Sequence, residues 1–156
     1  MIFEIVLVST VVVGMVLLAI FFGGGYKKEK ALLTPAEHNF FSQVLARLEG
    51  KYRVATKVRI ADIVQPKSKS PKALYGITSK HADFVLCSRE NFEPLLVIEL
   101  DDSSHQRKDR KKRDVFVDKV YKSAKLPILH VKAKKTYDAE ALVSEIEAKL
   151  LSLADS

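Results

Sequence analysis

The chain has 156 residues and a formal net charge of +7, from 26 basic and 19 acidic side chains. The first 25 residues contain no lysine or arginine and one acid, Glu4, so the remainder carries a net charge of +8. That remainder is long enough for one small domain with a single core. One cysteine, Cys87, excludes an intramolecular disulfide, and four scattered histidines give no zinc-binding spacing.

An uninterrupted apolar segment begins the chain. Every residue in 5–22 is apolar or small, and a helix of that length nearly spans a hydrocarbon core of about 30 Å. The segment lacks the positive start and the small-residue cleavage site of a signal peptide. We therefore expect a transmembrane anchor over residues 1–25, whose three final glycines form a flexible hinge.

Lysine placement predicts the orientation of this anchor. Three lysines follow the apolar segment in YKKEK, residues 26–30, whereas only Glu4 precedes it. Because positively charged loops stay on the cytoplasmic side, we expect a single-pass protein of the bacterial inner membrane. Residues 26–156 would then form a basic cytoplasmic domain.

The first elements of that domain follow from capping residues and side-chain spacing. Thr34 and Glu37, with a proline between them, have the pattern of a capping box, which predicts a helix as far as Gly50. Alternating apolar residues over 52–60 predict a half-buried strand. Proline, serine, glycine and lysine are frequent over 61–81, which predicts a long basic loop.

Two hydrophobic strands are expected next. Residues 82–87 and 95–100 flank a turn near Asn91 and form an antiparallel hairpin, whose second strand is apolar on both faces and therefore central. A helix over about 104–124, a strand over 127–132 and an amphipathic helix complete the order. This order predicts an α/β fold with a mixed sheet of four to five strands flanked by helices, preceded by the transmembrane helix.

The hairpin brings acidic side chains together. Asp83 and Glu99 are equidistant from the turn, so they face each other across the two strands with Cβ atoms about 5 Å apart. Two facing carboxylates repel each other unless a divalent cation lies between them. Asp101 shares the face of Glu99, and His105 follows in the segment VIELDDSSH. The alternative is that these acids end a strand and cap the next helix, without a ligand.

The ordered segments TPAEHNFF, ADFVL, VIELDDSSHQRKDRKKRD and PILHV resemble the PD-(D/E)XK, restriction-endonuclease-like superfamily. The similarity is greatest to a bacterial branch with an E-x-D-x-x-x-H signature, which is related to very-short-patch repair endonucleases. The resemblance implies a nuclease that depends on Mg²⁺ or Mn²⁺, with the metal bound by Asp83 and Glu99. Glu37 corresponds to the superfamily's acid on the first helix, although it also suits the capping box.

One position departs from the superfamily's pattern. Asp101 stands where the resemblance implies a catalytic lysine. Either a neighbour such as His105, Lys80 or Lys112 replaces that lysine, or the domain has lost turnover. His105 is the candidate general acid or base, because an unperturbed imidazole titrates near neutrality.

A basic run, QRKDRKKRD over residues 106–114, begins the helix after these acids. Such a run is usually a solvated face, but here it follows the acids directly. Helical spacing directs Arg113 inward, where it can hold a phosphate. The other bases can contact a nucleic-acid backbone without reading its sequence, with DNA as the expected partner: Lys108, Arg110, Lys111 and Lys112.

Three functions remain open from the sequence. The first is a metal-dependent phosphodiesterase that acts on nucleic acid, and the second is a catalytically silent nucleic-acid-binding module of the same fold. The third is a basic domain that binds anionic lipid beside its own anchor. Metal-dependent cleavage separates the first from the others, and nucleic-acid binding in EDTA separates the second from the third.

Overall fold

The computed structural model describes residues 1–22, 25–67, 71–101 and 108–154. Within these ranges, the side chains of residues 2, 19–22, 108–114 and 152–154 are not described, so these residues contribute only their helical backbone. The chain divides into two compact units, Met1–Ala31 and Leu32–Ser156.

Helix α1, Ile2–Phe22, makes up most of the first unit. Within the described part of the chain, no helix is long and apolar enough to cross a membrane. The predictions of a transmembrane anchor and of a single-pass protein in the inner membrane were therefore wrong. Residues 23 and 24 of the predicted hinge lie outside the described ranges.

The second unit is built around a mixed sheet whose four strands lie in the order β1, β2, β3, β4. β1 (Arg53–Arg59) pairs antiparallel with β2 (His81–Cys87), which pairs antiparallel with β3 (Pro94–Asp101). β3 pairs parallel with β4 (Ile128–Lys132), and helix α5 (Lys108–Ala124) belongs to the crossover that a parallel pair requires. The predicted hairpin and the central place of its second strand are confirmed.

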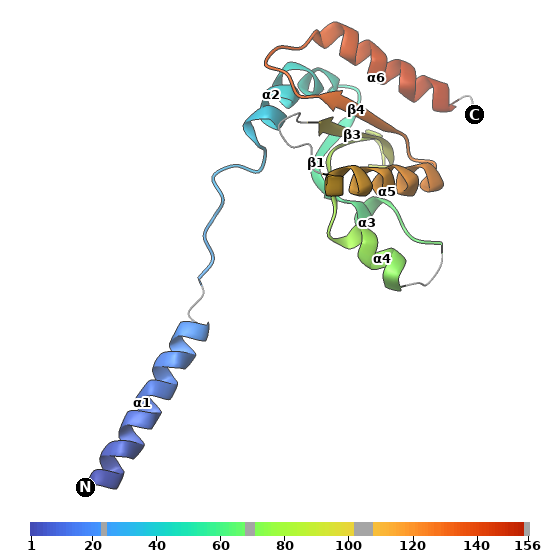
Figure 1. Ribbon diagram of the computed structural model, residues 1–156. Coiled ribbons are helices and arrows are strands. Elements are labelled where there is room, and N and C mark those ends of the chain that lie inside the picture. Colours follow the sequence, from blue (N-terminus) through green and yellow to red (C-terminus); the bar gives the residue numbers. More distant parts are fainter. Residues whose placement is uncertain (23–24, 68–70, 102–107, 155–156) are drawn as a thin grey trace. The chain divides into compact units, whose positions relative to one another are not determined.

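Helices cover both faces of this sheet (Figure 1). On one face, α2 (Pro35–Gln43), the 3₁₀ helix η1 (Leu45–Leu48) and α6 (Ala139–Ala154) enclose what we call the α6-side core. On the other face, α3 (Ile60–Ile63), α4 (Pro71–Thr78) and α5 enclose the α5-side core.

Side-chain alternation divides each strand between the two cores. In β3, Leu96 and Ile98 belong to the α6-side core and Val97 belongs to the α5-side core. All three side chains are fully buried. Both faces of β3 are therefore covered, which explains why its sequence is apolar without interruption until Glu99.

The start of α2 follows from its capping residues. Thr34 Oγ1 accepts a hydrogen bond from Glu37 N at 3.3 Å, and Glu37 Oε2 accepts one from Thr34 N at 2.9 Å. The predicted capping box is therefore confirmed. It fixes the backbone of Glu37 at the first turn of the helix, while the second carboxylate oxygen, Oε1, remains available for another contact.

The prediction of a long loop over 61–81 was wrong, because this segment contains α4 and most of α3. With four and eight residues, these helices are too short to show a helical period in the sequence. Their tertiary contacts are nevertheless extensive, since Ile60, Ala61 and Ile77 are buried in the α5-side core.

Candidate active site

The register of the hairpin brings Asp83 towards Glu99. Phe84 lies opposite Ile98, and Val85 lies opposite Val97. One further step along the same register leads to Asp83 and Glu99, the pair expected from the sequence. A hydrogen bond from Leu100 N to Asp83 Oδ2, at 3.0 Å, joins the two strands at this point.

Lys57, on the neighbouring strand β1, joins two acids of this site. Its Nζ lies 3.2 Å from Asp83 Oδ1 and 2.5 Å from Glu37 Oε1, and it donates to both. The three side chains are largely buried, with exposed fractions of 28% for Lys57, 20% for Asp83 and 10% for Glu37. One oxygen of Glu37 thus has the predicted capping role at the start of α2, and the other binds the ammonium of Lys57.

The backbone is irregular at the step shared by Lys57 and Asp83. Thr56 pairs with Phe84 and Val58 pairs with Ala82, but no regular pair forms between them. Lys57 has a φ of 53°, in the left-handed region, which costs an L-residue about 1 to 2 kcal/mol.

This irregularity changes which core the following side chains enter. In β1, Val54 packs in the α6-side core, and simple alternation would return Val58 to the same core, yet Val58 packs in the α5-side core. In β2, Ala82 likewise shares the α5-side core with Val85. Lys57 and Asp83 therefore lie where both strands exchange faces.

The charges of Lys57 and Glu37 stabilise each other. Burial raises the pKa of Glu37, but the hydrogen bonds from Lys57 and Thr34 outweigh it, so that its pKa lies below the ordinary value of 4.5. Burial lowers the pKa of Lys57, but the hydrogen bond to Glu37 and the charge of Asp83 outweigh it, so that its pKa lies above 10.5. Both groups are therefore charged at neutral pH.

Lys57, Asp83 and Glu99 lie on three neighbouring strands, and His130 adds a polar residue from the fourth strand, β4. It lies opposite Glu99 in the parallel pairing of β3 and β4. Its Nδ1 is 3.5 Å from Asp101 Oδ2, and its Nε2 is 3.2 Å from Asp118 Oδ1 on α5. His130 thus connects the end of β3 to α5, and each strand supplies one residue to a polar row: Lys57, Asp83, Glu99 and His130.

Tyr121 brings a buried hydroxyl to the site from α5. The residue is fully buried, and among the described residues its hydroxyl has no hydrogen-bond partner. Burial raises the pKa of this hydroxyl far above its ordinary value, and the negative charges of Glu99, Asp83 and Asp118 raise it further.

The carboxylates of this site fit a magnesium ion that has few protein ligands and keeps most of its waters. Among the described residues, no group of three or more His, Cys, Asp or Glu is placed to share a metal. Mg²⁺, however, is commonly held by one or two carboxylates and keeps several waters. Asp83 and Glu99 could supply such oxygens, since a carboxylate oxygen that accepts one hydrogen bond retains a second lone pair. The buried, unpaired hydroxyl of Tyr121 beside them fits a site that receives a polar guest.

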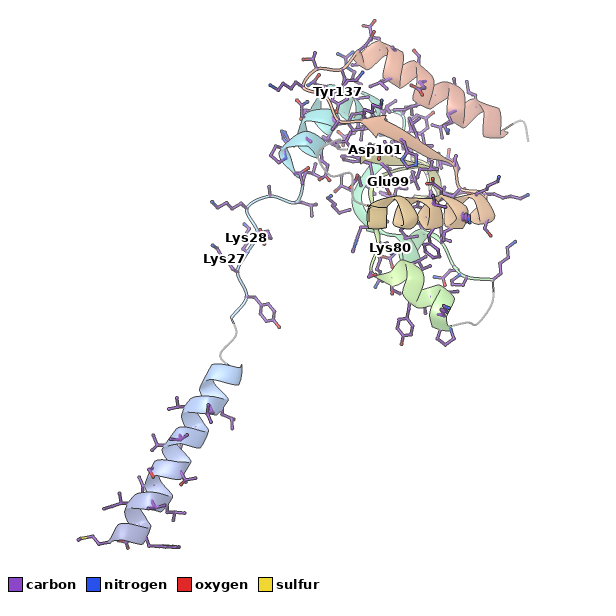
Figure 2. The ribbon with its side chains drawn as sticks, in the orientation of Figure 1. Lys27, Lys28, Lys80, Glu99, Asp101 and Tyr137 are labelled. Carbon is purple, nitrogen blue, oxygen red and sulfur yellow. The ribbon has the colours of Figure 1, made fainter. Side chains whose placement is uncertain are left out.

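The other residues selected from the sequence differ in how much the structure says of them. Asp101 (Figure 2) is an exposed residue at the end of β3, and its carboxylate lies 3.5 Å from Nδ1 of His130. The Nζ of Lys80, a candidate for the missing lysine, lies over the ring of Phe116, 5.8 Å from the centroid. His105 lies outside the described residues. The bases of the predicted nucleic-acid surface belong to α5, and the structure describes their backbone but not their side chains: Lys108, Arg110, Lys111, Lys112 and Arg113.

Lys57 and His130 were not selected as site residues from the sequence. Lys57 was assigned only to a strand face, and no sequence signal marked its left-handed backbone. His130 was visible as a polar residue in the apolar segment PILHV, and such an interruption of a buried strand was the one signal that could have selected it.

No curated protein and no solved structure matches the chain. The family described as "Protein of unknown function (DUF2726)" matches residues 29–150, which is more than half of the chain. This range includes every strand of the sheet and the four residues of the polar row, Lys57, Asp83, Glu99 and His130. The chain therefore belongs to the DUF2726 family.

Proposed function

We propose that the second unit is a divalent-metal-dependent phosphodiesterase that acts on nucleic acid. The observation that carries this proposal is the position of Lys57. Its ammonium contacts Asp83 on β2, and Glu99 lies on the next strand, β3. A cationic side chain therefore lies beside a pair of carboxylates. This is the combination of groups that the resemblance to PD-(D/E)XK nucleases leads one to expect, although the lysine comes from a different strand.

Each residue has a role in this proposal. Asp83 and Glu99 hold Mg²⁺ or Mn²⁺, which supplies a Lewis acid for the phosphoryl oxygen and a more acidic bound water. Lys57 offsets the charge that collects when a phosphate approaches two carboxylates. Glu37 holds Lys57 in position, because its own carboxylate is fixed by the capping box at the start of α2.

Charge supports a polyanionic substrate. The chain has 26 basic and 19 acidic residues, and five of the bases begin α5 between residues 108 and 113. Phosphate contacts from such side chains bind nucleic acid with little dependence on sequence and strong dependence on salt. We propose that this first part of α5 binds the nucleic-acid backbone, with DNA as the first substrate to test.

One observation favours a second candidate, a binding module without turnover. Both oxygens of Asp83 already have partners, Lys57 Nζ and Leu100 N. The carboxylates can therefore hold the strands together without any metal. In that case the basic residues of α5 still bind nucleic acid, but the protein does not cleave it.

The test is cleavage by the full chain of labelled single-stranded DNA, duplex DNA and RNA, with Mg²⁺, with Mn²⁺ and with EDTA. We expect metal-dependent cleavage, and a loss of about 100-fold or more in Asp83→Asn and Glu99→Gln. The control is Asp62→Asn, which removes a surface carboxylate paired with Arg59 and should leave the rate unchanged. Binding without cleavage under all metal conditions would establish the second candidate instead.

A further inference from the structure

The hydroxyl of Tyr121 has no evident structural role among the described residues. Tyr121 is fully buried, and its hydroxyl has no hydrogen-bond partner among the residues that the structure describes. Folded proteins rarely keep such a group, because burial removes its hydrogen bonds to water without replacing them. A phenylalanine would fill the same space in the core without this cost.

Tyr121 lies near the two carboxylates of Asp83 and Glu99, which we call the acidic site. The residue packs in the α5-side core together with Val85 and Val97. Glu99 follows Val97 by two residues on the same strand, so alternation directs it to the same face. Glu99 and Asp83 are also the carboxylates whose charges act most strongly on the Tyr121 hydroxyl.

The hydroxyl can act here only as a neutral donor or acceptor. Burial and the three carboxylates around it, Glu99, Asp83 and Asp118, all raise its pKa. It therefore keeps its proton at neutral pH. Since a protonated phenol donates well to an oxygen that carries negative charge, the local charges favour a donor role.

We propose that Tyr121 is a positioning residue of the acidic site, whose hydroxyl donates a hydrogen bond to an oxygen of the hydrated cation held by Asp83 and Glu99. This inference rests on the proposed function and deepens it. Groups that orient the outer ligands of a metal contribute about 10- to 100-fold to its affinity. Tyr121 would contribute in this way without contacting the metal itself.

The experiment compares Tyr121→Phe with a matched control in the full chain. Melting temperature is measured without metal, and the affinity for Mn²⁺ and Mg²⁺ is measured by titration calorimetry. We expect Tyr121→Phe to keep or raise the metal-free melting temperature, because it removes an unpaired buried hydroxyl. Its affinity for the cation should fall about 10- to 100-fold.

The control is Tyr137→Phe, since Tyr137 (Figure 2) is also buried but its hydroxyl accepts a hydrogen bond from Lys134 N at 2.9 Å. This variant should lower the metal-free melting temperature and leave the cation affinity unchanged. As a second readout, Tyr121→Phe should have no further effect on cation affinity in a Glu99→Gln background, because coupled residues are not additive.

The outcomes separate this inference from the proposed function. If the unmodified chain binds the cation and Tyr121→Phe binds it equally well, the role of Tyr121 is refuted while the metal site stands. A fall in the metal-free melting temperature of Tyr121→Phe as large as that of Tyr137→Phe would also refute it, because the hydroxyl would then have a protein partner. If the unmodified chain binds neither cation, the metal site and the role of Tyr121 both fail.

Discussion

The ammonium of Lys57 lies 3.2 Å from Oδ1 of Asp83, at the step where the side chains of β1 and β2 exchange faces. The same ammonium binds Glu37 on α2, so one side chain connects a helix to two strands. An ion pair in this position can serve stability and chemistry together, because it places a fixed positive charge beside the carboxylates of the site.

Replacement of Lys57 by methionine should lower the free energy of unfolding by about 2 to 3 kcal/mol, because it leaves the largely buried Glu37 and Asp83 without a cation. The control is Lys51→Met, which breaks an ion pair with Glu147 whose lysine is 65% exposed. That change should cost less than about 1 kcal/mol. Urea unfolding of both variants at neutral pH measures the difference, and equal effects would show that Lys57 is no more important than a surface lysine.

The pKa of Glu37 gives a prediction for stability against pH. Because its folded pKa lies below the ordinary value of 4.5, its contribution is complete above about 4.5 and is lost as the pH falls through the folded pKa. Glu37→Gln lacks this contribution. The stability difference between the unmodified chain and Glu37→Gln should therefore be constant from about pH 6 to 8 and shrink below about pH 4.5. A difference that stays constant in acid would contradict the ion pair with Lys57.

Lys57 gives the corresponding prediction in alkali. Its folded pKa lies above 10.5, so its contribution is complete below about 10.5 and is lost as the pH rises through the folded pKa. Lys57→Met should remove this alkaline loss. Urea unfolding near pH 9, where both states still carry the charge, should show the full difference between the two proteins, whereas a difference that is already absent there would contradict the prediction.

The sequence predicted the acids of this site better than it predicted their partners. Asp83 and Glu99 could be paired because a short turn sets the register of a hairpin. Lys57 could not be placed, because side-chain alternation assumes a regular strand, and a residue with φ of 53° breaks that rule without a glycine to mark it. His130 could not be paired with Glu99, because the register of a parallel pair depends on how a long crossover packs.

Helix α5 is followed by a residue in the left-handed backbone region, Lys125. Lys125 has a φ of 56°, and the bonds from Lys125 N to Lys122 O and from Leu126 N to Tyr121 O form the Schellman arrangement. Lys125→Gly should therefore stabilise the protein by about 1 kcal/mol. Lys119→Gly, at an exposed position inside the same helix, should instead destabilise it by about 1 kcal/mol. Thermal unfolding would contradict the prediction if both changes had the same sign.

The single cysteine gives a probe of unfolding. Cys87 is 4% exposed on β2, and burial raises the pKa of its thiol. Because the thiolate is the reactive form, a thiol reagent should modify the folded protein far more slowly than the protein in denaturing urea. The rate of modification should follow the unfolded fraction as urea increases. Rapid modification in native buffer would show that β2 is accessible in the folded state.

Asp83→Asn should destabilise the protein without metal, and both Asp83→Asn and Glu99→Gln should reduce its response to metal. From the facing carboxylates alone, removal of one charge would be expected to relieve repulsion. The structure reverses this expectation for Asp83, because its carboxylate binds the ammonium of Lys57 and accepts from Leu100 N. Asp83→Asn should therefore lower the metal-free free energy of unfolding by about 1 to 2 kcal/mol.

With Mg²⁺ or Mn²⁺ present, a ligand of the native state raises the melting temperature of the unmodified chain. Both variants should lose most of this rise, because each removes one of the two carboxylates proposed to hold the cation. Melting curves with the metal and with EDTA measure the two effects separately. If Asp83→Asn is destabilised but responds to the metal like the unmodified chain, then Asp83 only holds the strands together, and the binding module without turnover becomes the better account.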